Sequence, residues 1–428
     1  MENWYLPNGL VYCTGTLKSQ SVLIAAGRVA ALGEEADRLQ KGWVGPIGVF
    51  DARGCLISRG FVDLHTHLRE PGFVDKETIA SGTAAAAAGG FTSVCPMPNT
   101  APPLDSTEAL RALEAKIERG AVVKIHPIAA LTVGRRGKTP VEYGGFVSRG
   151  VRLFSDDGDP LADEIAQEVF EKVQRAGGVL INHLEDKSLV GEGFFYGQIP
   201  PESEYIMLHR DLRLAAKTNC PYHAAHLSCR QAVDLIARAK ERGLPVSAEV
   251  TPHHLTLTHR DIREPKGNFQ MKPPLRGEAD RQALLAGLAA GIIDFVATDH
   301  APHGSEKEGG LYGRSPFGVT GLETAFPILY TTLVVTGQIS LVRLLESMTN
   351  GPARFLGLDQ ELAVGAAADV VVVDLKRRRT VVKDRFKSKG TNSPYLGQTL
   401  TGWPCLTLVD GKQRYICKDN EGRLSYAD

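Results

Sequence analysis

The sequence predicts a (β/α)8 TIM barrel of the α/β class, together with a small β-sandwich domain that both ends of the chain build. Two observations predict this fold. In the middle of the chain, apolar strand-like runs alternate with helical stretches, which fits a closed barrel better than an open sheet. Both ends, in contrast, are rich in strand-like runs and turns. We therefore expect a barrel over residues 56–359 and a composite domain from residues 1–55 and 360–428.

The two ends of the chain carry patterns of antiparallel strands. Residues 21–33 have the pattern of a hairpin, and residues 49–51 form one more strand-like run. At the far end, residues 369–376 are strand-like, and residues 406–416 read as a second hairpin with Asp410-Gly411 as its turn. We expect residues 1–55 to hold only short strands and turns.

The middle of the chain supplies eight predicted barrel strands and several helices. The strands are expected at Phe61–His65, Thr92–Pro96, Val122–Ala129, Val151–Phe154, Val179–Asn182, Tyr222–Leu227, Val246–Val250 and Asp294–Thr298. Helical periodicity is found in Lys76–Ala88, Thr107–Arg119, Asp163–Arg175, Arg230–Arg242 and Asp280–Ala290.

Composition excludes several classes of protein. The chain has 428 residues, with 49 Lys and Arg against 49 Asp and Glu, so its balanced charge predicts neither a nucleic-acid nor a membrane-surface partner. It has no apolar run of about 18 residues, so we expect no membrane span. The first ten residues lack a signal-peptide pattern, and the seven cysteines are scattered without a CxxC motif. These features predict a cytoplasmic protein with reduced thiols.

Ligand-type residues stand at the ends of the predicted strands. His65 and His67 are two positions apart, so a strand would point both imidazoles to the same face. A single His-x-His also fits ordinary strand-end histidines. Here, however, further His and Asp residues follow other strands: Asp156, Asp157, His183, His226, Asp299 and His303. Neutral imidazoles with carboxylates suit a pair of zinc ions, and active sites of TIM barrels lie at these strand ends.

Two further residues have a predicted chemical role. Asp299, at the end of the eighth strand, is placed to take a proton from an activated water and to pass it to a leaving nitrogen. Arg69 follows the metal-type histidines and can form a fork with a substrate carboxylate. Its alternative role is a surface ion pair with Glu70 or Asp75.

Several long motifs then resemble one family. They read GFVDLHTHLREPG, KETIASGTAAAAAGGFTSVCPMPNT, FSDDG, EVTPHHL, KPPLR, FVATDHAPH, SPFGVTGLETAFP and TNGPARFLGL. The set resembles the amidohydrolase superfamily and, more narrowly, its bacterial type I dihydroorotases. The resemblance covers residues from about 55 to about 360, and the β-rich ends match the small composite domain of that family.

The resemblance implies a metal-ligand set. His65 and His67 would bind one zinc ion, and His183 and His226 would bind the second. Many superfamily members bridge the two metals with a lysine on the fourth strand, but residues 151–154 contain none. The family pattern instead implies an aspartate of the SDDG turn, Asp157 in preference to Asp156. Asp299 would be both a metal ligand and the general base.

The resemblance also implies a substrate site. Arg69, Asn99 and His303 match residues that hold the substrate carboxylate and ring, and the backbone at Phe317-Gly318 matches a loop that closes on the ring. Where the family often has an asparagine before Pro-Pro-Leu-Arg, this chain has Lys272. That lysine can reach an anionic substrate or point away from it.

The implied activity is the zinc-dependent, reversible cyclisation of N-carbamoyl-L-aspartate to L-dihydroorotate, in pyrimidine biosynthesis. The family also implies a homodimer and, in some members, association with aspartate transcarbamoylase. Two alternatives stay open: a cyclic amidase of the dihydropyrimidinase or allantoinase type, and a catalytically silent homologue that scaffolds aspartate transcarbamoylase. Zinc, cobalt and manganese are not distinguished by His and Asp ligands.

The remaining histidines are given structural roles. His253 and His254, after the seventh strand, are expected to support the site only indirectly or to be structural. His223 is assigned to packing or to the surface. His300, next to Asp299, is expected to orient its loop rather than to bind metal.

Overall fold

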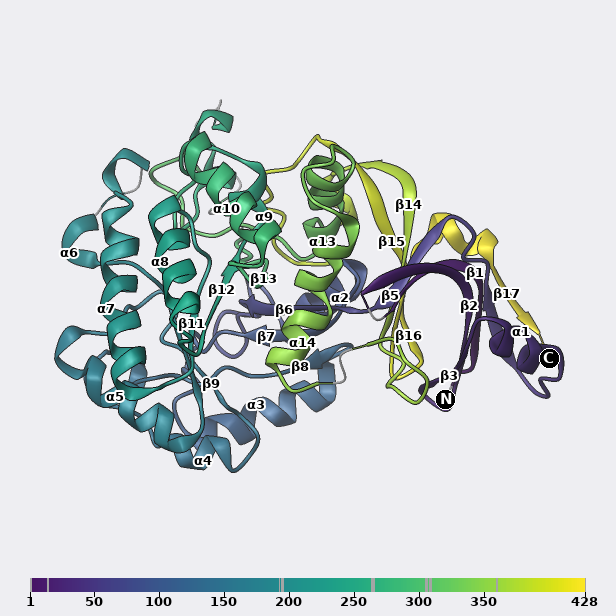
Figure 1. Cartoon of the computed structure of the whole chain (residues 1–428), viewed down its shortest axis with the longest axis horizontal. Helices are drawn as coiled ribbons and strands as arrows, with labels where there is room; N and C mark the ends of the chain where they lie inside the picture. The colour runs from purple at the N-terminus through teal and green to yellow at the C-terminus, as the bar shows by residue number, and fades with distance from the viewer. Residues whose placement is uncertain are drawn as a thin grey trace.

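The computed structural model describes residues 2–13, 15–191, 193, 196–262, 266–304, 307, 310–358 and 361–427. Two bodies lie side by side in it (Figure 1). A barrel wrapped by helices occupies the left of that view, and a curved sheet occupies the right, where both chain ends lie. Within the described residues, no helix combines the length and apolar character that a membrane span requires.

Eight short parallel strands line the barrel. They are β6 (Phe61–Thr66), β7 (Phe91–Pro96), β8 (Lys124–Ile125), β9 (Leu153–Phe154), β10 (Val179–Asn182), β11 (Tyr222–Ala224), β12 (Val246–Val250) and β13 (Phe295–Val296). They pair in the order β6-β7-β8 and β9-β10-β11-β12-β13. Two parallel bridges, Ala129 with Phe154 and Thr66 with His300, join these sheets into a closed ring. The predicted barrel is therefore confirmed.

Helices surround the ring. The helices of the barrel are α2 (Ile79–Ala88), α3 (Thr107–Gly120), α4 (Tyr143–Val147), α5 (Asp163–Ala176), α6 (Lys187–Val190), α7 (Glu202–Thr218), α8 (Arg230–Glu241), α9 (Pro252–Thr256), α10 (Glu278–Ala290), α12 (Ala325–Leu329), α13 (Leu341–Met348) and α14 (Asn350–Phe355). α2 begins at Ile79 and not at Lys76 as predicted, because Thr78 forms a capping box with Ser81. The first backbone N–H groups of a helix have no partner within the helix, and the cap provides one at this point.

The ends of the chain form one nine-stranded sheet. Its strands are β1 (Trp4–Cys13), β2 (Thr16–Ala25), β3 (Arg28–Leu32), β4 (Ile47–Phe50), β5 (Cys55–Arg59), β14 (Val370–Thr380), β15 (Thr399–Val409), β16 (Lys412–Ile416) and β17 (Leu424–Ala427). β1 branches the sheet: on one edge it pairs with β4 near its start and with β5 near its end. β5 pairs with β14, so the sheet unites the two ends of the chain, as the sequence predicts.

One helix in the terminal segment contradicts the prediction of strands and turns alone. α1 (Glu34–Lys41) follows β3, and its Ala36 is fully buried. Ala36 packs with Leu23, Ala31 and Ile47 in a small cluster on the sheet. Its acidic first turn and basic last turn favour a helix, and packing of Ala36 on the sheet stabilises this short segment further.

The barrel and the terminal sheet share a hydrophobic core. Leu56, Val371 and Trp403 of the terminal sheet belong to the same buried cluster as the barrel residues Phe61 and Phe91. The chain passes from β5 into β6 through Gly60, where a Cβ atom would lie 2.1 Å from the Thr92 side chain. The division into two domains stays a prediction, and its boundary at residues 359–360 lies outside the described residues.

Candidate metal centre

The six predicted metal ligands come together at the C-terminal ends of the barrel strands. His65 lies on β6, and the others follow strand ends: His67, Asp157, His183, His226 and Asp299. All six are at least nine-tenths buried. Two groups of three hold their ligand atoms within 4.8 Å of one another: His65 with Asp157 and His226, and His65 with His67 and Asp299.

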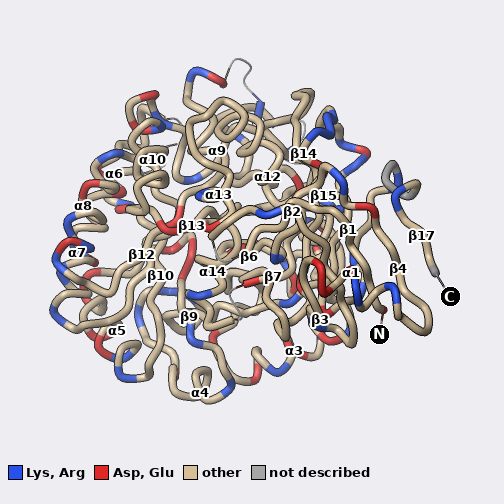
Figure 2. Tube along the Cα trace, turned by 45° about the vertical axis from the view of Figure 1, so that its right-hand side comes forward, with Lys and Arg blue, Asp and Glu red and all other residues tan. Residues whose placement is uncertain are grey.

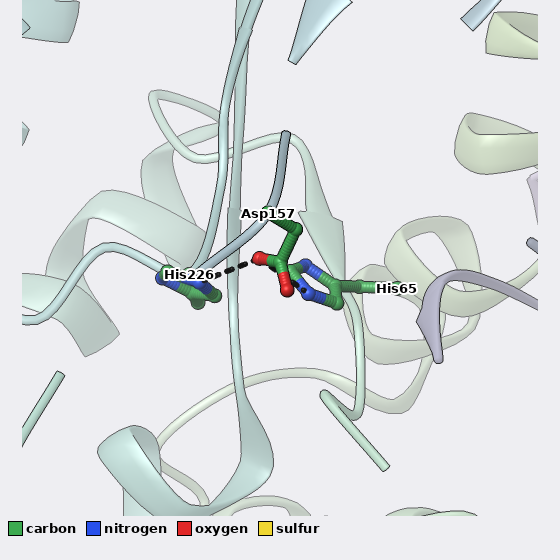
Figure 3. A group of neighbouring side chains, drawn as sticks. All are labelled: His65, Asp157 and His226. Carbon is green, nitrogen blue, oxygen red and sulfur yellow. Dashed lines mark ion pairs between the residues drawn. The ribbon is translucent and has the colours of Figure 1, made fainter. Parts of the chain in front are cut away.

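Asp157 occupies the centre of the cluster. Figure 3 shows its carboxylate between the rings of His65 and His226. Its Oδ1 lies 3.3 Å from His65 Nε2, 3.7 Å from His183 Nδ1 and 3.8 Å from His226 Nε2. Its Oδ2 lies 3.6 Å from His67 Nε2. This one carboxylate therefore faces all four imidazoles, as a ligand shared by two metals would.

Asp156 is used differently. Its Oδ1 accepts hydrogen bonds from the Leu131 and Thr132 backbone N–H groups at 2.8 and 3.2 Å, and Thr132 Oγ1 donates to its other oxygen. Burial raises the pKa of Asp156 to about 6. Because these donors occupy the carboxylate, Asp156 fixes the loop after β9 and leaves Asp157 to face the cluster.

Asp299 contacts His65 on β6 and His67, which follows that strand. Its Oδ1 lies 2.9 Å from His67 Nε2 and 3.6 Å from His65 Nε2. Burial opposes ionisation of both central carboxyl groups, but the surrounding imidazoles outweigh it and hold the pKa of Asp157 and of Asp299 well below the usual range. Both groups are therefore acceptors, able to bind a cation.

The backbone is strained at three positions of this site. Arg69, His226 and Asp299 have φ angles of 61°, 31° and 48°, in the left-handed region that non-glycine residues rarely adopt. Such conformations persist only where the surroundings impose them, and they gather at functional sites.

Two buried carboxylates that the sequence analysis did not single out support the histidines. Glu249 on β12 lies 2.7 Å from His65 Nδ1 and 3.1 Å from His223 Nε2. Asp63 on β6 accepts from the backbone N–H of His65 and of Thr298, which ties β6 to β13. The sequence feature that could have identified both carboxylates is a charged residue within an otherwise apolar strand. His223, predicted to be a packing or surface residue, is buried and also contacts Glu249.

The Glu249 contact fits a metal at His65. If Nδ1 of His65 donates to Glu249, its Nε2 is left as a lone-pair donor. That Nε2 atom is buried and has no hydrogen-bond partner. A bound cation is the partner that would satisfy it, so the donor set fits a metal of the zinc type.

Asn99 joins the metal-type residues. Its Oδ1 lies 3.0 Å from His67 Nδ1, and its Nδ2 donates to Asp157 Oδ2 at 3.2 Å. The predicted substrate residue is thus also held within the cluster itself.

The other predicted substrate residues form a wall beside the cluster. Arg69 Nη2 lies 3.4 Å from His303 Nε2. The same His303 Nε2 lies 2.7 Å from the Phe317 carbonyl oxygen. Gly318 has a φ of 119°, and a Cβ there would lie 2.6 Å from the Cβ of Ala301, so only glycine fits. Lys272 pairs with Glu185 at 2.9 Å and lies 4.7 Å from the centre of the Phe317 ring.

Asn392, which the sequence analysis did not consider, anchors this wall. Its side chain accepts from the His303 backbone N–H and donates to the carbonyl oxygens of Ala301 and Gly318. It comes from the C-terminal segment, far from the barrel motifs in sequence. Two of the remaining histidines make structural contacts: His300 lies 3.4 Å from Glu77 and accepts from the Gly321 N–H, while His254 contacts Thr251 and the Pro273 carbonyl oxygen.

Comparison with known proteins decides the family. The model of the Amidohydrolase family matches residues 56–414. The chain belongs to the amidohydrolase family. Among curated amidohydrolase relatives, a dihydroorotase of Brevibacillus brevis is 41% identical over 94% of this chain and 96% of its own. A dihydroorotase of Caldanaerobacter subterraneus subsp. tengcongensis is 44% identical over 86% of this chain and 88% of its own. By these relatives, this amidohydrolase is a member of the dihydroorotase group and a hydrolase of cyclic amides.

Solved amidohydrolase structures share the whole fold. The L-hydantoinase (dihydropyrimidinase) of Arthrobacter aurescens has a TM-score of 0.87 at 26% identity, covering 96% of each chain. The dihydropyrimidinase of Brevibacillus agri has a TM-score of 0.85 at 25% identity, covering 96% of this chain and 94% of its own. The fold is thus common to enzymes of different cyclic amides, and the substrate must be argued from the site.

Proposed function

We propose that this chain catalyses the dihydroorotase reaction, the interconversion of N-carbamoyl-L-aspartate and L-dihydroorotate, as a step of de novo pyrimidine (UMP) biosynthesis. The observation that carries the proposal is the cluster of four imidazoles around Asp157 and Asp299, with Arg69 and His303 beside it. The dihydroorotase relatives, at 41% and 44% identity, support the same reaction.

Two zinc ions per subunit are part of the proposal. His65 and His67 would hold one ion, His183 and His226 the other, Asp157 would bridge them, and Asp299 would complete the set. The buried, unpartnered His65 Nε2 and the ionised carboxylates support this assignment. When bound, zinc would lower the pKa of water and polarise the scissile carbonyl.

Asp299 is the general base in this proposal. In the ring-opening direction, water adds to the ring amide carbon and the bond from that carbon to the ring nitrogen breaks. Asp299 takes the proton from the water and delivers it to the departing nitrogen. In the biosynthetic direction the same steps run backwards.

The substrate wall would select for a carboxylate. Arg69 is the cation that would bind the carboxylate of dihydroorotate, with His303 and Asn99 beside it. The backbone at Phe317 and Gly318 would contact the ring. Lys272 already has Glu185 as a partner, so its contribution to substrate binding would be long-range charge rather than a direct contact.

The competing activity is that of a dihydropyrimidinase or allantoinase. The close fold match to L-hydantoinase is the observation in its favour. Those substrates lack the carboxylate of dihydroorotate and leave Arg69 without a use. A catalytically silent scaffold is the other competitor, and the complete set of six ligand-type residues argues against it.

We also propose that the chain forms a homodimer in the cytoplasm and that aspartate transcarbamoylase binds it. These assignments rest on the family resemblance. Mass measurement of the purified protein, alone and with aspartate transcarbamoylase, tests both.

An assay of the zinc-loaded protein tests the activity. Ring opening of dihydroorotate is measured beside that of dihydrouracil, which has the same ring without the carboxylate. The proposal requires turnover of dihydroorotate with little turnover of dihydrouracil. Comparable turnover of both would move the chain to the dihydropyrimidinases, and turnover of neither with zinc bound would favour the silent scaffold.

A further inference from the structure

A strongly basic stretch lies outside the metal centre. Residues 375–390, LKRRRTVVKDRFKSKG, contain eight Lys and Arg against one Asp, in a chain that has 49 of each charge overall. The stretch covers the end of β14 and the loop after it, and Figure 2 shows blue segments beside β14. Neither the proposed reaction nor the metal site uses this charge.

Part of the stretch lines a cavity of about 620 Å³. Arg379, Arg385 and Lys387 line it from the stretch, and Arg414 and Lys418 line it from β16 and the residues after it. We call it the basic cavity. It lies where the terminal sheet meets the barrel, because Ala88 of α2 and Thr324 also line it. Its volume is in the usual range for small-molecule sites, about 300–1,000 Å³.

The acidic side chains of the lining do not offset this charge. They are Asp384 and Glu323. Glu323 accepts from the backbone N–H groups of Lys387 and Ser388 at 2.8 and 3.1 Å, and burial raises its pKa to about 8. The lining therefore has five cationic side chains against two carboxyl groups, an excess of positive charge even where both carboxyl groups are ionised.

Aromatic side chains line the same cavity. They are Phe386, Trp403 and Tyr415. The guanidinium of Arg379 lies 5.5 Å from the centre of the Trp403 ring, so the indole holds this cation at the wall. Phe386 and Tyr415 are half-buried and provide apolar ring surface against which a planar ring can stack.

We propose that the basic cavity binds an organic polyphosphate that carries an aromatic ring, a ligand of the nucleoside triphosphate class. Arginines and lysines from β14, β16 and the segments that follow these strands would supply several phosphate contacts, and the guanidinium fork matches phosphate oxygens. The aromatic lining supplies a place for the ring. The proposal concerns a second site and does not depend on the activity of the metal centre.

Calorimetric titration of the zinc-loaded, full-length protein with ATP tests the proposal. Arg414→Glu and Lys418→Glu replace exposed cations of the lining, and each is expected to weaken ATP binding by about tenfold or more. The matched control is Arg378→Glu, which replaces an exposed residue of β14 that points to the face opposite Arg379. The control is expected to bind ATP within about twofold of the parent protein.

The outcomes separate this site from others. ATP that binds the parent protein and both lining variants equally would occupy another place, such as the metal centre, and would overturn the proposal. No ATP binding at millimolar concentration would also overturn it. Inorganic triphosphate is expected to bind more weakly than ATP, because it has no ring to stack on the aromatic side chains. Equal affinity for the two ligands would refute this stacking. Binding of a single-stranded RNA oligomer without binding of ATP would replace the small ligand by a macromolecular polyanion.

Discussion

Asp299 combines an ionised carboxylate with a strained backbone, and both features matter for a variant. Its φ of 48° is better tolerated by Asn than by Ala, so Asp299→Asn is the cleaner test. Loss of the base should lower kcat for dihydroorotate by on the order of 10³-fold. Circular dichroism should stay at the parent value, and the assay is run at saturating zinc because Asp299 is also a proposed metal ligand. Near-normal turnover would show that another group moves the proton.

Arg69 is the residue proposed to select substrates that have a carboxylate. Arg69→Met removes the charge beside His303 and should raise KM for carbamoyl-aspartate by about tenfold or more, with a smaller change in kcat. The slow turnover of dihydrouracil serves as the control. Its rate should not change in the variant, because dihydrouracil has no carboxylate for Arg69 to bind. An unchanged KM for carbamoyl-aspartate would mean that another cation reads the carboxylate.

Glu249 acts through His65. Its carboxylate orients the imidazole at 2.7 Å, so Glu249→Gln should weaken zinc binding by about 10- to 100-fold, measured by competition with a chelator. Ser247→Ala is the control, because it removes the other partner of His223 and leaves the contact between Glu249 and His65 intact. Equal zinc affinity in parent and Glu249→Gln proteins would reduce Glu249 to a packing role.

At the scale of elements, the site depends on where strands end and on what connects them. β8, β9 and β13 have only two residues each in regular pairing, although the predicted runs are longer. Beyond these pairs, the chain leaves the strand geometry so that Asp157 and Asp299 can turn toward the cluster. Single bridges at Ala129 and Thr66 still close the ring. An alternating apolar pattern identifies the strands, but it does not show that their regular pairing ends before the apolar run does.

The end of α2 illustrates a close contact between elements. A Cβ at Gly89 would lie 2.1 Å from the Leu322 carbonyl oxygen, in the segment that leads to α12. Gly89→Ala should therefore lower the free energy of unfolding by about 1–3 kcal/mol, measured by urea denaturation. At Gly120, the last residue of α3, the nearest atom to such a Cβ is 3.8 Å away. Gly120→Ala should be neutral or stabilising by less than about 1 kcal/mol, and equal losses in both variants would refute the packing argument.

At the scale of the whole molecule, Glu323 ties the terminal segment to the barrel and should make stability depend on pH. Burial raises its pKa from 4.5 to about 8, so the folded protein keeps a proton that the unfolded chain releases. Stability from this group should therefore fall as pH rises through that window and level off above it. Urea denaturation at about pH 5.5 and about pH 8.5 should show a larger loss for the parent protein than for Glu323→Gln. Parallel losses would contradict the raised pKa.

The whole molecule also explains which site residues were found in advance. The six ligand-type residues and Arg69 stand in local motifs at strand ends, so barrel topology alone predicts that they meet. Asn392 and Glu323 gave no such signal, because their partners lie 64 to 91 positions away and contact depends on how the terminal segment packs on the barrel. The basic stretch can be seen in the sequence. The cavity that it lines cannot, because β16 and α2 form part of the wall.

The sequence by itself determined the barrel, the strand-end histidines and aspartates, and the family, because alternating periodicity and motif spacing are local properties of the chain. Only the tertiary structure decided which of two adjacent aspartates faces the cluster. Thr132 and the backbone at Leu131 occupy Asp156, and Asp157 is left to the histidines. It also decided that Glu249 orients His65 across the barrel. These outcomes depend on hydrogen-bond partners that distant strands bring within about 3 Å, and no pattern along the chain encodes that distance.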